Sequence, residues 1–562
     1  MRRLFAILCC YVAASMVSVQ AQEPVALTGD IQAVTAPETK PETKPENMPE
    51  TVVSDSVETL LITLTAVKLS KALPVLKKLE AQGGADLLPM FKSMLEGDLY
   101  FIKSSKAVIA VAKTDGKLTG RTVLDNQDLG LIEKKQIKKI RVNNKLRVFL
   151  RQAIARLQIS APEAELRILA VKTLLKSLNS DTVEILISAR ASESDDDVRS
   201  MIDLALALHQ SASPLSETRY AAVVVLADSL EKEARNKLSE IAEQDSDKKV
   251  RVAAAKALKK INERIEFYDF IDQLFFGLSL GSVLLLAAIG LAITFGVMGV
   301  INMAHGEMIM LGAYTTYVVQ LMMPNAIEYS LWVAIPLAFV VSGLVGVMIE
   351  RGVIRHLHGR PLETLLATFG ISLILQQLVR SVFSPLNRQV ASPEWLSGSL
   401  EINPVLSLTL NRLYILAFAL LVFGLLLIIL RKTSLGLNVR AVSQNRDMAK
   451  AMGIKTGWVD AMTFGLGSGI AGIAGVALSQ LTNVGPNLGQ AYIIDSFMVV
   501  VFGGVGNLWG TLVAAFSLGI ANKFLEPVTG AVLASIFVLV FIILFIQKRP
   551  KGLFPQKGRA AE

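Results

Sequence analysis

The sequence predicts an all-α fold: a polytopic helical membrane protein with about eight or nine spans, preceded by a secreted helical domain that carries a small β-hairpin. Three observations support this prediction. Hydrophobic residues make up 52% of the 562 residues and the mean hydropathy is +0.48, which is too apolar for an ordinary soluble multidomain protein. Charged residues crowd the stretch before about residue 266, whereas long uncharged runs fill the rest. The chain also begins like an exported protein.

Residues 1–21 are predicted to form a signal peptide. Two arginines near the start are followed by an apolar run over residues 4–19 and by a small-residue cleavage site at residues 19–21. This order is typical of a secretory signal, although the apolar run is long enough that an uncleaved anchor is the alternative. Both cysteines, Cys9 and Cys10, lie in this segment. The mature chain is therefore expected to contain no disulfide.

Residues 22–55 are predicted to form a disordered tether. Its centre repeats proline, glutamate, threonine and lysine between residues 37 and 46. A segment with frequent proline and few apolar residues has little to offset the entropy lost on ordering. We therefore expect it to connect the signal to a folded domain without adding structure of its own.

Residues 56–266 are predicted to form a periplasmic domain of HEAT-like helical repeats. Four arginines share one register, each with a leucine seven residues later, and they form two pairs separated by 32 residues: Arg167 with Arg199, and Arg219 with Arg251. Such a separation is expected of stacked helical pairs, and a plain amphipathic bundle is the alternative. Ahead of these repeats, β-branched residues around Asp115-Gly116 predict a small β-hairpin. Either helical arrangement leaves an extended surface suited to binding protein.

Residues 267–548 are predicted to form the membrane domain. Nine runs have the length needed to cross about 30 Å of hydrocarbon. They cover residues 276–299, 303–323, 331–349, 364–383, 412–430, 458–480, 490–506, 508–525 and 529–547. The seventh and eighth runs are short and rich in glycine, so we expect eight or nine spans.

The basic residues between these runs predict the orientation. Arginine and lysine concentrate in the loops around residues 351–360 and 431–455 and in the tail at 549–562, whereas the intervening loops at 384–411 and 481–489 contain only Arg388. Loops rich in arginine and lysine are usually cytoplasmic. The sequence therefore predicts a multi-pass protein of the bacterial inner membrane, with the N-terminal domain periplasmic and the C-terminus cytoplasmic.

Several classes of function are not supported by the residues. The four histidines, at positions 209, 305, 356 and 358, have no metal-site spacing, and no Gly-rich phosphate loop is present. The net charge of +9 is spread over loops that flank apolar runs and forms no basic groove for nucleic acid. We therefore expect no enzyme activity, no cofactor, no metal and no nucleic-acid partner. Any ATP must be used by another subunit.

Polar residues interrupt the apolar pattern between the first two runs. Asn302, His305 and Glu307 lie at this junction. Ionisable groups in a membrane are costly unless they face a cavity or a partner, which makes this junction a candidate solute site. A solvated turn outside the membrane is the alternative for each residue taken alone.

Three ordered motifs carry a family resemblance across residues 270–555. They are GLAITFGVMGVINMAHGEMIMLGAY at 290–314, FMVVVFGGVGNLWG at 497–510 and RPKGLF at 549–554. Together they resemble the permeases of the branched-chain amino-acid family of ABC importers. The resemblance implies a permease subunit that works by alternating access. It also implies separate ATPase subunits, a homologous second permease and a periplasmic solute-binding protein as partners, with the lipid bilayer around it.

Two features resemble the urea-transport branch of that family. Typical amino-acid permeases of the family lack a secreted helical domain, whereas the urea branch carries one, and residues 359–377 also look like that branch. Urea is therefore the expected solute. A permease for branched-chain amino acids or short amides is the first alternative, and a membrane-anchored sensor or scaffold that uses the periplasmic domain is the second.

A neutral solute such as urea needs hydrogen-bonding groups along its pathway and no fixed charge pair. Besides the three junction residues, polar side chains within or beside the spans supply such groups: Thr368, Ser372, Gln376, Gln480, Thr482, Asn483 and Asp495. Each of them has the alternative role of a hydrogen bond between helices.

Residues 435–454 resemble the coupling helix with which such permeases dock on their ATPases. Ala449 and Gly453 lie four residues apart and predict a close-approach face, while Arg440 and Asn445 lie on the remaining surface. A merely solvated charged loop is the alternative.

Overall fold

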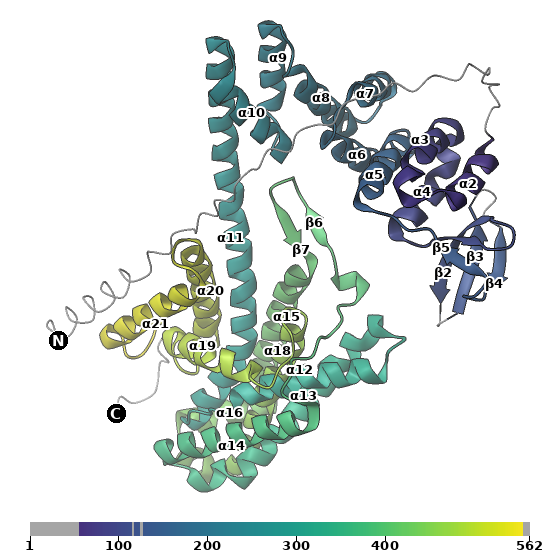
Figure 1. Cartoon of the computed structure of the whole chain (residues 1–562). Helices are drawn as coiled ribbons and strands as arrows, with labels where there is room; N and C mark the ends of the chain where they lie inside the picture. The colour runs from purple at the N-terminus through teal and green to yellow at the C-terminus, as the bar shows by residue number, and fades with distance from the viewer. Residues whose placement is uncertain (1–55, 115–116, 124–126, 555–562) are drawn as a thin grey trace, which may run out of the picture. The chain divides into compact units, whose positions relative to one another are not determined.

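The computed structural model describes residues 56–114, 117–123 and 127–554. The predicted signal peptide (1–21), the tether (22–55), the Asp115-Gly116 turn and the end of the predicted tail (555–562) lie outside the described residues. Within the described residues the chain is mostly helical, with a small antiparallel sheet in its N-terminal half (Figure 1).

Short helices open the described chain. They are α2 (Val57–Ala66), α3 (Ala72–Gly83) and α4 (Leu88–Glu96), with the 3-10 turns η1 (Leu69–Lys71) and η2 (Gly84–Leu87) between them. Apolar residues spaced three or four apart place one face of each helix inside, as Leu76 and Leu79 of α3 illustrate. Helix α4 ends at Gly97, whose φ of +87° is a left-handed conformation that glycine adopts without a Cβ clash.

A five-stranded antiparallel sheet stands where the sequence predicted only a hairpin. Its strands are β1 (Leu99–Ile102), β2 (Val108–Thr114), β3 (Lys117–Thr122), β4 (Asp128–Leu131) and β5 (Ile137–Lys139), in the order β4-β3-β2-β1-β5. The β2–β3 pair is the predicted hairpin. The edge strands β4 and β5 escaped prediction because they have only four and three residues, which is too short for a periodic pattern to signal a strand.

Helices then continue to the membrane domain. They are α5 (Asn144–Gln158), α6 (Ala164–Leu175), α7 (Ser180–Ser192), α8 (Asp196–Gln210), α9 (Ser216–Leu226) and α10 (Lys232–Gln244). Their apolar stripes form one core, to which the start of α11 also contributes. Each helix packs mainly on helices one or two positions away in the chain. Assignment of these helices to a HEAT-type repeat stays a prediction.

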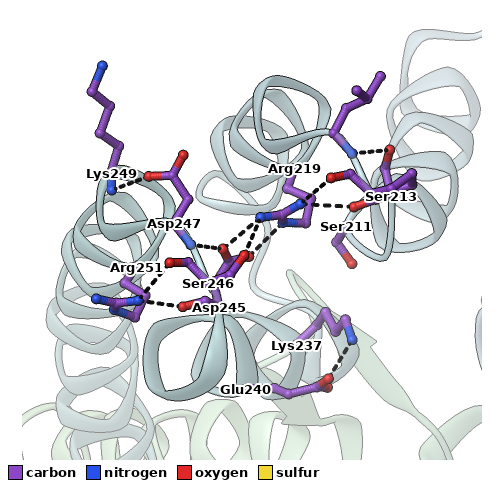
Figure 2. Close-up of polar contacts among 12 residues, drawn as sticks. Ser211, Ser213, Arg219, Lys237, Glu240, Asp245, Ser246, Asp247, Lys249 and Arg251 are labelled. Carbon is purple, nitrogen blue, oxygen red and sulfur yellow. Dashed lines mark hydrogen bonds and ion pairs between the residues drawn. The ribbon is translucent and has the colours of Figure 1, made fainter.

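The arginines of the predicted register form hydrogen bonds to the turns between these helices. Arg219 donates to both carboxylate oxygens of Asp245, at 2.7 and 2.9 Å, and to two carbonyls of the turn before α9 (Figure 2). Hydrogen bonding from this guanidinium holds the pKa of the Asp245 carboxyl below its ordinary value, against the opposing effect of burial. Arg251 donates to the backbone carbonyl of the same aspartate. Two arginines thus hold the turn before α9 and the turn between α10 and α11.

The same arrangement occurs 52 residues earlier. Arg167 donates to both oxygens of Glu193, at 2.8 and 2.9 Å, and to two carbonyls of the turn before α6, while Arg199 donates to the Glu193 carbonyl. Each group therefore has a counterpart 52 residues later in the same chain. The sequence showed the register of the arginines but not their acidic partners.

The C-terminal half consists of membrane-type helices. They are α11 (Lys248–Met298), α12 (His305–Met322), α13 (Ile327–Gly352), α14 (Pro361–Phe383), α15 (Leu410–Lys432), α18 (Thr456–Ser479), α19 (Leu488–Gly503), α20 (Leu508–Thr529) and α21 (Ala531–Lys548). Shorter elements lie between them: η3 (Ile354–Leu357), η4 (Glu394–Leu396), β6 (Ser399–Glu401), β7 (Ser407–Thr409), α16 (Ser434–Gln444) and α17 (Arg446–Ala451). Every predicted apolar run falls on one of the nine long helices.

Seven of the described helices are long and apolar enough to cross a membrane, which is fewer than the eight or nine spans predicted. The two predicted runs outside this set are α12, which carries several buried polar side chains, and α19, which has only 16 residues. The chain is thus a multi-pass membrane protein in which the polar helix α12 is mostly buried inside the protein. Helix α18 is central, since it packs extensively on α11, α12 and α13.

Helix α11 joins the two halves of the chain. It runs for 51 residues without a break, so the predicted domain boundary at residue 266 falls inside it (Figure 1). Its first part belongs to the core of the N-terminal helices and its last part to the membrane core. The stretch contains no proline, and its first glycine is Gly277, so nothing in the sequence ends the helix at the change of composition.

Candidate functional site

Two helices begin inside the membrane domain and meet at their first turns. After α11 ends at Met298, residues 299–304 are not helical, and α12 starts at His305. Gly306 of α12 faces Gly489 of α19 so closely that a Cβ on either residue would collide with the backbone of the other. Non-helical backbone within a membrane domain is tolerated where it is buried in protein or lines a cavity. Paired helix starts of this kind are typical of solute sites in transporters.

Glu307 lies at this meeting point and is bound by α14. Its Oε1 accepts hydrogen bonds from Ser372 Oγ at 2.9 Å and from Gln376 Nε2 at 2.8 Å. The side chain is buried, and among the described residues its Oε2 has no hydrogen-bond partner. Ser372 and Gln376 occupy the middle of the 23-residue helix α14, so Glu307 lies about halfway along a membrane-crossing helix.

Thr368 completes one polar face of α14. Its Oγ1 accepts a hydrogen bond of 3.2 Å from the backbone N–H of Met303 in the non-helical segment. Thr368, Ser372 and Gln376 follow each other at intervals of four residues, which places them on one face of the helix. The structure thus brings these three predicted residues to the junction. Ser372 and Gln376 form hydrogen bonds between helices, which was their alternative role, and Thr368 bonds to the non-helical segment.

Asn302 and His305 leave further polar atoms without partners. His305 is fully buried and its Nε2 lies 2.9 Å from the carbonyl oxygen of Ala287, which assigns the ring proton to Nε2. Asn302 Oδ1 accepts from the Ala304 N–H at 3.0 Å. Among the described residues, His305 Nδ1 and Asn302 Nδ2 have no hydrogen-bond partner. A buried polar atom without a partner costs about 1–3 kcal/mol, so these atoms are expected to meet water or solute.

The remaining predicted pathway residues lie around the turn between α18 and α19. Gln480 is buried, and its Oε1 has no partner among the described residues. Thr482 lies just after the end of α18 and donates to the carbonyl of Leu478, and Asn483 is exposed. Asp495 is half-buried about two turns into α19. None of these four side chains has a hydrogen bond to the Glu307 group among the described contacts.

Arg380 is a residue that the sequence reasoning missed. It follows Gln376 by four residues on the same face of α14, and its Nη2 donates to Asn487 Oδ1 at 2.7 Å, just before α19 begins. The guanidinium thereby connects α14 to the turn that carries Gln480 and Thr482. The four-residue spacing from Thr368 onward was the signal that would have found it.

The predicted coupling segment forms two short helices with a different exposed face from the one expected. Arg440 donates to the carbonyl of Leu430, Asn445 Oδ1 caps α17 by accepting from the Met448 N–H at 2.9 Å, and Ala449 is buried. Gly453 is exposed with a φ of +87°. Ala449 therefore packs inside this chain and does not offer a docking face.

Apolar side chains form the exposed face of this segment instead. Met448 and Met452 are 61% and 77% exposed, and Leu437 of α16 is 60% exposed. The two methionines are four residues apart and lie on one face. Large apolar groups exposed together outside the membrane helices indicate a protein contact.

Residues 273–546 match the protein family described as "branched-chain amino acid transport system / permease component". The high-affinity branched-chain amino acid transport system permease protein BraD of Pseudomonas aeruginosa is 30% identical over 299 residues, which cover 51% of this chain and 96% of the relative. The corresponding LivH protein of Escherichia coli is 30% identical over 300 residues, with the same coverage. The ribose import permease protein RbsC of Bacillus subtilis is 32% identical over 113 residues, or 19% of this chain and 35% of the relative. No solved structure matches the chain.

Proposed function

Because this chain belongs to the family of permease components of branched-chain amino acid transport systems, we propose that it is the membrane-spanning permease subunit of an ATP-driven importer. As predicted, it is a transport subunit and not itself an enzyme. Separate ATPase subunits, a homologous second permease and a periplasmic solute-binding protein are its proposed partners. The observation that carries the proposal is the junction of α12, α14 and α19, where buried polar atoms without partners lie halfway along the membrane helices.

The proposed transport cycle assigns a task to each part of the chain. Solute enters on the periplasmic side and exchanges its water for the free acceptor of Glu307 and the free donor of Asn302. The ATPases dock on residues 434–455, whose arginines and lysines favour a cytoplasmic position. The ATPases close when they bind ATP and open after they hydrolyse it, and this motion moves the docked segment. Helix α18, which packs on α11, α12 and α13, transmits the movement to the helices around the junction. Alternating access needs such a change of packing at a fixed site.

Branched-chain amino acids are the first candidate solutes, and the names of the relatives support them. The junction suits the amino-acid backbone. The starts of α12 and α19 bring the positive ends of two helix dipoles close together, which favours a carboxylate. The buried carboxyl of Glu307 supplies an acceptor for an ammonium group.

Urea is the second candidate, supported by the domain that precedes the match to the relatives and by one segment within the match. The aligned residues cover only about half of this chain, and the N-terminal helical domain precedes them. The likeness of residues 359–377 to the urea branch points the same way. A neutral solute with N–H donors and a carbonyl would pair with Glu307 Oε2 and with Asn302 Nδ2. A sensor or scaffold is less well supported, since the relatives are all named as permeases.

Deleting the gene tests both the function and the solute. We expect the deletion strain to lose uptake of one labelled solute at low external concentration: loss of leucine uptake assigns the amino acids, and loss of urea uptake assigns urea. Restoring the gene on a plasmid should restore the same uptake, and a labelled sugar serves as the control. Unchanged uptake of both leucine and urea would contradict the proposed function in either form.

A further inference from the structure

We infer that an ionic cluster between α13, α17 and α18 is the joint through which the coupling segment moves the solute junction, with Arg446 and Asp460 as positioning residues. The cluster consists of Arg446, Asp460 and Glu350. This inference rests on the proposed function, because it concerns how movement of docked ATPases reaches the solute. Nothing in the sequence comparison identifies these residues as a unit, since they come from three separate elements.

Arg446 and Asp460 connect the coupling segment to the central helix. Arg446 is the first residue of α17, and its Nη2 donates to Asp460 Oδ2 in the second turn of α18. The Asp460 side chain is 4% exposed and that of Arg446 is 24% exposed. Such an ion pair is largely shielded from water, so removing one partner leaves an uncompensated buried charge.

Glu350 brings α13 into the same cluster. It is buried near the end of α13, within electrostatic range of Asp460, Arg446 and Arg355. Among the described residues, Glu350 Oε2 and Asp460 Oδ1 have no hydrogen-bond partner. Two carboxyl groups with spare acceptor atoms thus lie near the guanidinium groups of Arg355, Arg351 and Arg446, so that Arg446 has an alternative to Asp460 as its partner. A joint that changes position needs alternative partners of this kind.

The neighbouring residues hold the ends of α13 and α18 together. The Arg351 guanidinium lies over the Trp458 ring, 5.5 Å from its centroid. Arg355 lies against Gly457, where a Cβ would come within 2.6 Å of its Nη2. His358 faces Arg446, Asp460 and Lys450, and burial together with Arg446 holds the pKa of His358 below its ordinary value. The cluster thus has neighbours from α13, from the segment that follows α13 and from α18.

Helix α18 carries the connection from the cluster to the junction. Asp460 and Gly467 are seven residues apart, which is two turns, on the same face and about 10 Å along the helix. Gly467 packs on Gly290 of α11, where a Cβ at Gly290 would collide with the Gly467 carbonyl and lie 2.8 Å from the His305 ring. Displacement of α18 by the cluster therefore acts directly on the backbone next to His305.

The test separates coupling from docking and from folding. Arg446→Gln and Asp460→Asn are made in the full chain, assembled with its ATPases and reconstituted, and both ATP hydrolysis and solute uptake are measured. We expect both variants to retain the ATPases and to hydrolyse ATP, while uptake per ATP falls at least tenfold. Arg446→Lys, which keeps the charge, should recover part of the loss. Arg360→Gln removes an exposed pair with Glu363 and serves as the matched control.

Two results would overturn the inference. Uptake per ATP within twofold of wild type in both variants means that the cluster is not the joint. Loss of ATPase binding in variants that insert normally means that the cluster maintains the docking surface instead. Failure of the unaltered chain to bind ATPases or to drive uptake would reject the proposed function itself, which is a separate outcome. Asp460→Asn changes no side-chain volume, so it remains informative if Arg446→Gln fails to fold.

Discussion

We expect the double variant Met448→Glu with Met452→Glu to lose its ATPase subunits and all ATP-driven uptake, while the permease itself inserts and folds normally. Both side chains are more than 60% exposed, so the folded permease gives up little apolar contact when they change. In the proposed complex they enter an apolar groove of the ATPase. Burying two carboxylates there without partners costs several kcal/mol, which is enough to abolish the complex. Co-purification of tagged permease with the ATPases measures the loss.

The controls distinguish docking from local strain. Met448→Leu with Met452→Leu keeps the apolar face and should retain the ATPases. A substitution at Gly453 is a poor probe, since its φ of +87° would strain any other residue and mix the two effects. Retention of the ATPases and normal uptake by the double glutamate variant would mean that this face is not where they dock.

The second large effect is expected from Glu307→Gln at the junction. The glutamine carbonyl is able to accept from Ser372 and Gln376 as Oε1 does now, which keeps α12 and α14 together. Its amide group then replaces the free acceptor Oε2 by a donor. A solute that donates an N–H to this atom meets a donor instead. We expect uptake to fall at least tenfold, because a hydrogen bond to a charged group contributes about 1.5–3 kcal/mol and 1.4 kcal/mol is tenfold in binding.

The matched control removes a hydrogen bond on another side of α12. Ser342 of α13 donates to the carbonyl of Met308 at 3.1 Å, and Ser342→Ala deletes this bond without touching Glu307. If Glu307 acts only as a link between helices, Glu307→Gln and Ser342→Ala should both transport nearly normally. If it binds solute, only Glu307→Gln loses uptake, and it does so with its ATPases still bound.

The sequence predicted those helices whose position in the fold requires a long or periodic pattern of apolar residues. Crossing hydrocarbon demands long apolar runs, so all nine predicted runs fall on helices. The same rule could not show that α12 begins next to α19, because the contact of Gly306 with Gly489 joins residues far apart in sequence. Edge strands β4 and β5 were missed because strands of four and three residues are too short to show a periodic pattern.

The sequence predicted several residues of the candidate site but not how their side chains are arranged. Glu307, Ser372 and Gln376 were predicted because they are polar residues within apolar runs. Polar groups in a membrane are energetically costly unless they face a cavity or a partner. Which of their atoms stay unpaired depends on packing that only coordinates provide. At the coupling segment the prediction chose Ala449 for its small size. It is buried because α17 turns that side inward, and Met448 is exposed instead.

ATP-dependent uptake into proteoliposomes tests most directly the claim that this chain carries solute as one subunit of an ATP-driven importer. The purified chain would be reconstituted with its second permease, ATPases and binding protein, and labelled leucine and urea supplied separately with the binding protein. We predict accumulation of one of these solutes only when ATP is present at the ATPases and the binding protein is on the opposite face. Equal entry with and without ATP, or no entry of either solute by a complex that hydrolyses ATP, would contradict the claim.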